Sequence, residues 1–153
     1  MIKIQKTDFD ISVELKLLTT GNINIGGVAS FVGLVRENSD GEEILTMTLE
    51  HYPGMTEKIL QKLECEALDR WSLENLLIIH RYGELNPGDQ IVLVITTSAH
   101  RSAAFESCQF LIDRLKNGAP FWKKEKTVRG TRWVEAKEED REAGERWQNI
   151  VKY

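Results

Sequence analysis

Hydrophobic positions along the chain recur at two spacings, which together predict a mixture of strands and helices. An alternation with Ile2 and Ile4 on one side predicts an edge strand over residues 1–6. Residues 90–97 form the run richest in β-branched side chains, so we expect a central strand there. Further strands are expected over 28–35, 44–52 and 76–82.

Three segments show the spacing of three to four residues that is typical of an amphipathic helix. Asp8 is expected to cap the first, a short helix with Ile11, Leu15 and Leu18 on its apolar side. The second begins at Pro53-Gly54 and has a stripe of Leu60, Leu63, Ala67 and Trp71. The third runs from about Arg101 to Lys116 and buries Ala104, Cys108, Leu111 and Leu115. Residues 117–120, Asn-Gly-Ala-Pro, end it.

The C-terminal third contains a predicted hairpin and a charged tail. Residues 121–128 and 131–136 are expected to pair as strands joined through Arg129-Gly130. Residues 36–41 are polar and expected to be mobile, and 137–153 predict either a short helix or a loose tail. Strands mixed with two long helices indicate an α+β fold, and 153 residues fit one domain, 1–153.

Composition and charge narrow the classes of partner. The chain has 41% hydrophobic and 29% charged residues, as in a soluble globular protein, and a formal net charge of −4. This acidic balance disfavours nucleic acid as a partner, so any anion site must be a local cluster of cations. No apolar run approaches the roughly 18–20 residues of a membrane span. The N-terminus shows no secretory signal, so we expect a cytoplasmic protein without a membrane partner.

Motifs for metal, cofactor and serine chemistry are missing from the sequence. Cys65 and Cys108 are far apart and form no metal-binding spacing, so two buried free thiols are expected. The patterns GxSxG, GxGxxG, HExxH and the P-loop do not occur. The sequence therefore predicts neither a metal site nor a cofactor.

Residues 98–101, Ser-Ala-His-Arg, form the first candidate anion site. They lie where the expected central strand gives way to the third helix. Helix N-termini expose backbone N–H groups to anions, and His100 and Arg101 would add charged donors. The alternative is a plain helix cap beside a surface arginine.

Residues 116–125 form the second candidate site. In a strand that follows Pro120, Phe121, Lys123 and Glu125 share one face, and Trp122, Lys124 and Lys126 share the other. Lys116 can approach Lys123 across the turn. Crowded cations favour the neutral amine, which is the better nucleophile or base. The alternative is a solvated basic strand.

Other single residues carry weaker signals. Val35-Arg36 ends a strand, but a lone arginine is commonly a surface residue. His51 and His80 lie within strand-like runs and are interpreted as structural.

Several stretches, in their order and spacing, resemble the molybdopterin synthase catalytic subunit (MoaE) family. They are Gly27–Arg36, Leu49–Glu57, Ile79–Leu85, Pro87–Asp89, Thr97–Arg101, Leu115–Lys116, Ala119–Glu125 and Arg132–Ala136. They cover most of residues 27–137. The resemblance implies an α/β hammerhead fold with an additional antiparallel β subdomain.

The resemblance also implies a function. Members of this family are sulfurtransferases that convert precursor Z, a cyclic pyranopterin monophosphate, into molybdopterin by building its dithiolene for molybdenum cofactor biosynthesis. The sulfur comes from a small ubiquitin-like subunit as a thiocarboxylate on its C-terminal Gly-Gly. Two such subunits dock on a homodimer of the catalytic subunit, which gives a heterotetramer.

Matched residue by residue, the resemblance implies a set of site residues. Lys116 and Lys123 would be catalytic. The substrate-binding residues would be Leu34, Val35, Arg36, His100, Arg101, Lys116, Lys123, Lys124 and Glu125, with Glu125 positioning Lys123. Two positions depart from the family pattern: Leu34 stands where lysine is frequent, and Lys137 where some members have arginine. A lysine lacks the two-pronged contact of arginine.

Other functions are compatible with the same residues. One alternative is a non-catalytic anion- or nucleotide-binding module that needs no protein partner. Another is a module that binds the tail of a ubiquitin-like protein without chemistry. RNA binding by Trp122 and the lysines is disfavoured by the acidic total.

Overall fold

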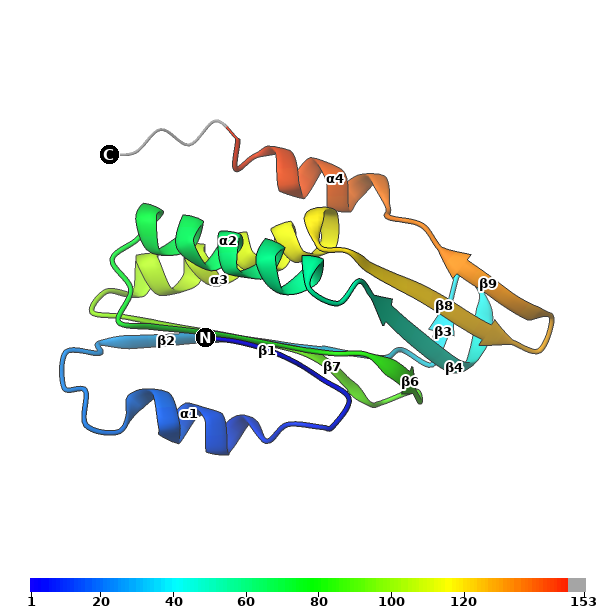
Figure 1. Cartoon of the computed structure of the whole chain (residues 1–153), viewed down its shortest axis with the longest axis horizontal. Coiled ribbons are helices and arrows are strands. Elements are labelled where there is room, and N and C mark those ends of the chain that lie inside the picture. The colour runs from blue at the N-terminus through cyan, green and yellow to red at the C-terminus, as the bar shows by residue number, and fades with distance from the viewer. Residues whose placement is uncertain (149–153) are drawn as a thin grey trace.

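A computed structural model describes residues 1–148 and has two sheets and four helices in that range (Figure 1). The helices are α1 (Ile11–Thr19), α2 (Met55–Arg70), α3 (Arg101–Gly118) and α4 (Glu138–Glu145). The strands are β1 (Ile2–Gln5), β2 (Gly27–Leu34), β3 (Asn38–Ser39), β4 (Glu42–His51), β5 (Asn75–Arg81), β6 (Gly83–Leu85), β7 (Gln90–Ser98), β8 (Phe121–Thr127) and β9 (Gly130–Val134).

The first sheet has the order β1-β5-β7-β2 and separates two layers of helices. Strand β1 runs parallel to β5, and the other pairs are antiparallel. The edge position of β1 and the interior position of β7 confirm the sequence predictions. Because side chains alternate along β5, Leu77 and Ile79 pack under α1, and Leu76 and Ile78 face α2 and α3.

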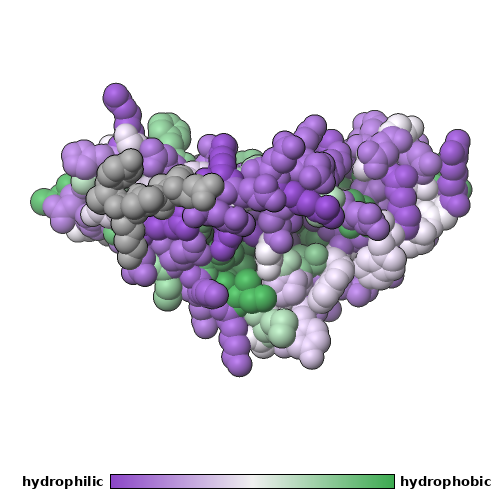
Figure 2. All heavy atoms as spheres, turned by 90° about the horizontal axis from the view of Figure 1, so that it is seen from above, coloured by the Kyte–Doolittle hydropathy of each residue, from purple (hydrophilic) through white to green (hydrophobic). Residues whose placement is uncertain are grey.

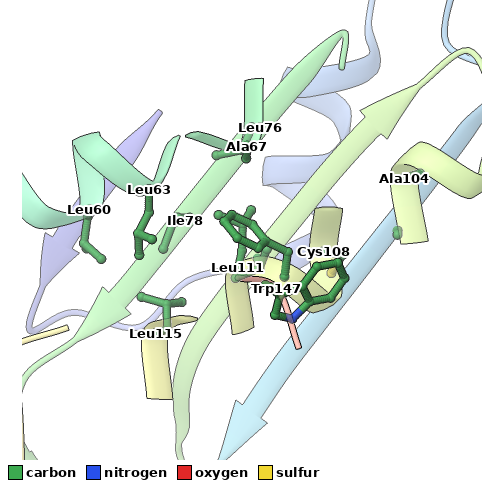
Figure 3. Close-up of a cluster of buried hydrophobic side chains, with 13 residues drawn as sticks. Leu60, Leu63, Ala67, Leu76, Ile78, Ala104, Cys108, Leu111, Leu115 and Trp147 are labelled. Atoms are coloured by element: carbon green, nitrogen blue, oxygen red, sulfur yellow. The ribbon is translucent and has the colours of Figure 1, made fainter. Parts of the chain in front are cut away.

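The larger core lies between this sheet and helices α2 and α3 (Figure 3). The predicted stripes of both helices lie there, with Leu60, Ala67 and Leu111 fully enclosed and Trp71, just past the end of α2, partly buried. Trp147 joins this core from the C-terminal segment, and its indole N–H donates to the Asp113 carboxylate at 2.7 Å. The end of the described chain is therefore part of the core.

The second sheet has the order β3-β4-β8-β9, with β6 also paired to β4, and every pair is antiparallel. A third cluster of buried side chains, from β4, β6, β7 and the end of β2, joins it to the first sheet. The α+β class with an additional antiparallel sheet is thereby confirmed. Strands β3 and β6 were not predicted, since two or three residues are too few to show a period.

Several local predictions need correction. Asp10, not Asp8, caps α1: its carboxylate accepts from the backbone N–H of Ser12 at 2.8 Å. The Asp8 carboxylate instead accepts from the side chain of Gln90 at 2.8 Å. The expected polar loop 36–41 contains β3, paired to β4. Cys65 is exposed on α2, so only Cys108 is the buried thiol that was expected.

Of the two predictions for residues 137–153, the structure has the helix, as α4. Arg146 contacts Asp113 at 2.7 Å, and Arg70 donates to the Trp147 carbonyl at 2.8 Å, so the segment is tied to α3 and α2. The face that carries α4 is mostly hydrophilic, with smaller apolar areas between the polar side chains (Figure 2). Residues 149–153 of the predicted tail lie outside the described part. None of the helices in residues 1–148 is long and apolar enough to cross a membrane.

Candidate active site

Strand β8 carries the second candidate site and has two unlike faces. Phe121, Lys123 and Glu125 point inward, and Glu125 is only 3% exposed. Lys123 lies opposite Leu49 of β4, and Glu125 lies opposite Met47, both buried in the third core. Trp122 and Lys126 are exposed on the outer face, which confirms the predicted alternation.

Lys123 is a lysine in an environment that disfavours its charge. Burial lowers its pKa below the ordinary value, and the nearby positive charges of Lys116 and Arg36 lower it further. The carboxylates of Asp140 and Glu125 oppose this effect. Lys116 and Arg36, from the end of α3 and just past β2, are therefore close enough to act on Lys123, as the sequence predicted for Lys116.

Lys116 lies in the last turn of α3 and is about half exposed. Its ammonium is 3.5 Å from the Asp140 carboxylate of α4. The side chain of Asn117 donates to the backbone carbonyls of Asp113 and Asp140, which fixes α4 against this turn. Asp140 was not predicted as a site residue, because its place depends on how α4 packs back onto α3.

Glu125 has a different partner from the one predicted. Its carboxylate accepts from Nε and Nη2 of Arg132, at 3.2 and 3.1 Å. Arg132 lies directly opposite on β9 and also donates to the Ser39 carbonyl at 3.0 Å. Among the residues of the described range, Lys123 makes no hydrogen bond to Glu125, so Glu125 acts on it through charge alone.

The segment after β2 brings Arg36 to this cluster. Val35 is buried, and its N–H donates to the Asp89 carbonyl at 2.9 Å while its own carbonyl accepts from Gly88 at 2.8 Å. These two bonds fix the strand end against the turn before β7. Leu34 and Arg36 on either side are exposed.

His100 and Arg101 lie at the opposite end of α3 from Lys116. Fifteen residues of helix separate Arg101 from Lys116, which corresponds to about 22 Å. Both side chains are exposed, and the first turn of α3 carries no acidic residue. The structure therefore does not bring the first candidate site to the lysines within one chain.

The other predicted residues lie around the margin. Lys124 points outward, 5.2 Å from the Trp133 ring centroid and 4.0 Å from the Glu50 carboxylate. Lys137 is exposed just before α4, whose first turn is acidic.

Burial raises the pKa of the Cys108 thiol to about 11, which makes it a poor nucleophile. No group of three or more His, Cys, Asp or Glu side chains within residues 1–148 is arranged to hold a metal ion.

Comparisons with known proteins identify the family of this chain. The family model described as MoaE protein matches residues 4–118. A molybdopterin synthase catalytic subunit from Pseudomonas aeruginosa is 52% identical over 147 residues, which is 96% of this chain and 98% of that relative. The family model includes Arg36 and Lys116 and ends before Lys123, whereas this relative aligns over nearly the whole chain.

Solved structures share the fold. A molybdopterin biosynthesis MoaE protein from Burkholderia ambifaria superposes with a TM-score of 0.83 at 48% identity, covering 98% of this chain and 99% of that one. A chain from a complex of subunits 1 and 2 of molybdopterin-converting factor from Helicobacter pylori has a TM-score of 0.71 at 24% identity, with 90% of each chain covered, and shows the fold alone. On the family match and the extent of these similarities, the chain belongs to the MoaE protein family.

Proposed function

We propose that this chain is the catalytic subunit of a molybdopterin synthase and that Lys116, Lys123 and Arg36 form its sulfur-transfer site. It would transfer sulfur from the C-terminal thiocarboxylate of a small ubiquitin-like subunit to precursor Z and form the dithiolene of molybdopterin. Residues 1–153 would act as one catalytic domain. The observation that carries the proposal is a partly buried lysine flanked by two further cations in a chain 52% identical to such a subunit.

The electrostatics of the cluster suit this reaction. Precursor Z carries a phosphate and the thiocarboxylate is an anion, so their approach is repulsive unless fixed positive charge lies between them. Three cations from three separate elements supply that charge, and Asp140 neutralises only part of it. A partly buried site strengthens these interactions relative to water.

The two lysines suit different roles. Lys116 is the more exposed, so it can meet the incoming tail and stabilise the carboxylate that departs after sulfur transfer, or hold a covalent intermediate. Lys123 has a lowered pKa, so it can exchange a proton near neutral pH more readily than an ordinary lysine. Leu34, Val35, Arg36 and Glu125 would line the substrate site around them, whereas Lys124 points outward at its margin.

A homodimer would complete the site with His100 and Arg101. Strand β2 is, like β1, an edge strand of the first sheet; it begins beside Arg101 and ends just before Arg36. In a twofold-symmetric contact along this edge, the start of one β2 meets the end of the other. His100 and Arg101 of one copy would then approach the lysines of its partner. Apolar side chains are exposed here on β2 and α3: Val28, Phe31, Leu34 and Phe105.

The sulfur donor would be a separate small subunit, because the chain offers no suitable thiol. Cys108 is buried with a raised pKa, and Cys65 is exposed on α2, outside the group of charges that act on Lys123. The Helicobacter pylori structure is a complex of two subunits of molybdopterin-converting factor, which supports a paired assembly for this fold. The complete assembly would be a heterotetramer of two large and two small subunits.

The test is Lys116→Ala with precursor Z and thiocarboxylated small subunit, read out as dithiolene product by mass spectrometry. Loss of a cation that acts in the transition state is expected to slow product formation by at least roughly 100-fold. Lys62→Ala, on α2, is the matched control for loss of a lysine. Near-normal turnover by Lys116→Ala would refute the role of Lys116, and tight partner binding by the wild type without product would favour a tail-binding module.

A further inference from the structure

His80 is a polar side chain in an apolar layer. It lies on β5 and faces the same side as Leu76 and Ile78, toward the core under α2 and α3. Its exposure is only 7%, and its ring stacks on Phe121 with centroids 3.6 Å apart and planes 11° apart. A leucine would fill this place without the cost of burying polar atoms, but it could not stack flat on the Phe121 ring. The stack is therefore the feature of His80 that needs an explanation.

The state of the His80 ring follows from its surroundings. Nδ1 is 2.8 Å from the Arg81 carbonyl, which can only accept, so Nδ1 carries the hydrogen. Burial lowers the pKa of His80 to about 4, and the nearby charges of Lys123 and His51 act in the same direction. The ring is therefore neutral at physiological pH, and it adds no positive charge beside Lys123.

A second histidine, His51 on β4 of the second sheet, also packs near Phe121. His51 lies opposite Phe121 in the β4–β8 pairing, with ring centroids 6.1 Å apart, and its ring is 4.6 Å from that of Tyr82. The Thr56 hydroxyl donates to the Tyr52 carbonyl, so it accepts from His51 Nδ1 at 3.3 Å. Phe121 is thus in contact with a ring of each sheet.

Phe121 is also the link between the two lysines. It begins β8 five residues after Lys116, and it shares the inner face of the strand with Lys123. Any shift of Phe121 would therefore move the start of β8 and, with it, Lys123. His80 is the ring in closest contact with this residue.

We propose that His80 is a positioning residue of the sulfur-transfer site: its neutral ring, stacked on Phe121, fixes the start of β8 and holds Lys123 beside Lys116 and Arg36. The expected effect of His80 on turnover rests on the proposed function. The expected effect of His80 on the reactivity of Lys123 does not depend on that function. The imidazole takes no part in proton transfer, and a flat neutral ring is the property that matters.

The experiment compares His80→Phe, His80→Ala and the control Leu76→Ala. Leu76 lies on the same face of β5, so its truncation creates a cavity in the same core away from Phe121. Folding of each chain is checked by circular dichroism and thermal unfolding. The first readout is the rate of acetylation of Lys123 against pH, measured by peptide mass spectrometry on the full chain, because only the free amine reacts. The second is kcat and KM for the thiocarboxylated small subunit.

Loss of the stack in His80→Ala is expected to shift the Lys123 labelling profile toward that of an ordinary lysine. It should also lower kcat by roughly 10-fold to 100-fold with a smaller change in KM, as for a misplaced catalytic group. His80→Phe should restore both to within about twofold, since it keeps a flat neutral ring. Leu76→Ala should lower the unfolding temperature and leave the labelling profile unchanged.

Two results would overturn the inference. An unchanged Lys123 profile in a folded His80→Ala chain would show that the stack does not position Lys123. Loss of turnover in His80→Phe with a normal profile would show that the imidazole itself takes part in the chemistry. A wild-type protein that transfers no sulfur would refute the proposed function, and the labelling comparison would still decide the role of His80.

Discussion

The two faces of β8 place neighbouring lysines in opposite environments. Lys123 points inward, where burial and the charges of Lys116 and Arg36 lower its pKa. Lys124 points outward, over the Trp133 ring and near Glu50, partners that suit an ammonium in contact with solvent. The residue type is the same, so the fold alone makes one lysine chemically unusual. A cluster of lysines in a sequence is therefore less informative than the face on which each one lies.

The comparison is tested most directly by truncating Lys123 and Lys124 in turn. Lys123→Ala is expected to lower the rate of dithiolene formation by roughly 100-fold to 1,000-fold, because it removes a preorganised cation beside the reacting groups. Lys124→Ala removes an exposed contact and should change the rate by less than about threefold. Single-turnover assays with precursor Z and thiocarboxylated small subunit measure both.

Equal losses in the two variants would contradict the comparison. A large loss confined to Lys124→Ala would move the site to the outer face of β8. Circular dichroism and thermal unfolding of both variants are the control, because Trp133 and Leu49 could each lose packing when the neighbouring lysine is removed.

The burial of His80 should also make the free energy of unfolding depend on pH. His80 has a pKa of about 4 in the folded chain and an ordinary value of 6.5. Between these values the unfolded chain binds a proton that the folded chain does not, so the free energy of unfolding falls as pH falls from 6.5 toward 4. The expected loss is about 3 kcal/mol, complete below the folded pKa.

Urea unfolding at pH 7 and pH 4.5 measures this loss. His80→Phe has no group to titrate at this position. Its free energy of unfolding should therefore fall less than that of the wild type between these two pH values, and the difference should account for most of the expected loss. Carboxylates such as Glu125 titrate in both chains, and the difference between wild type and variant removes their contribution. An identical pH dependence in the two chains would mean that His80 is accessible to protons in the folded state.

How far the site could be predicted from the sequence depends on how far apart the contacting residues lie along the chain. The alternation along residues 121–127 placed Lys123 and Glu125 on one face, because that pattern needs only the strand period, and the structure shows that this face points inward. The Arg132 partner of Glu125 was not within reach of the same reasoning, because the predicted turn at Arg129-Gly130 would set Glu125 opposite Val134. The observed turn lies one residue earlier, at Val128-Arg129, and sets Glu125 opposite Arg132. The helical rise likewise separates Arg101 from Lys116 by about 22 Å within one chain.

Other features depend on tertiary packing that no local pattern encodes. Asp140 reaches Lys116 because α4 turns back along α3, fixed by Trp147 and Asp113. His80 was interpreted as structural, and its stack on Phe121 ties it to the strand that carries Lys123. The place of His100 and Arg101 in the site stays a prediction about a second copy of the chain.

The smallest expected effect concerns the carboxylates that lie next to Lys116 and Lys124. Asp140 lies 3.5 Å from Lys116, and Glu50 lies 4.0 Å from Lys124, so Asp140→Asn and Glu50→Gln remove one negative charge on each side. Asp140 also raises the pKa of Lys123, so its removal should shift the alkaline-side pKa of the pH–rate profile downward. It should also lower KM for the anionic tail by roughly twofold to fourfold, since exposed ion pairs contribute less than about 1 kcal/mol.

Steady-state kinetics at low and high salt measure this change. The decrease in KM for Asp140→Asn should shrink as salt screens the partly exposed cluster, whereas Glu50→Gln should match the wild type at both salt concentrations. The Asn117 contact uses the backbone carbonyl of Asp140, so it survives the substitution and keeps α4 in place. A KM that rises in Asp140→Asn would mean that the carboxylate orients Lys116 for the tail, and equal shifts in both variants would mean that the tail senses only the net charge of the chain.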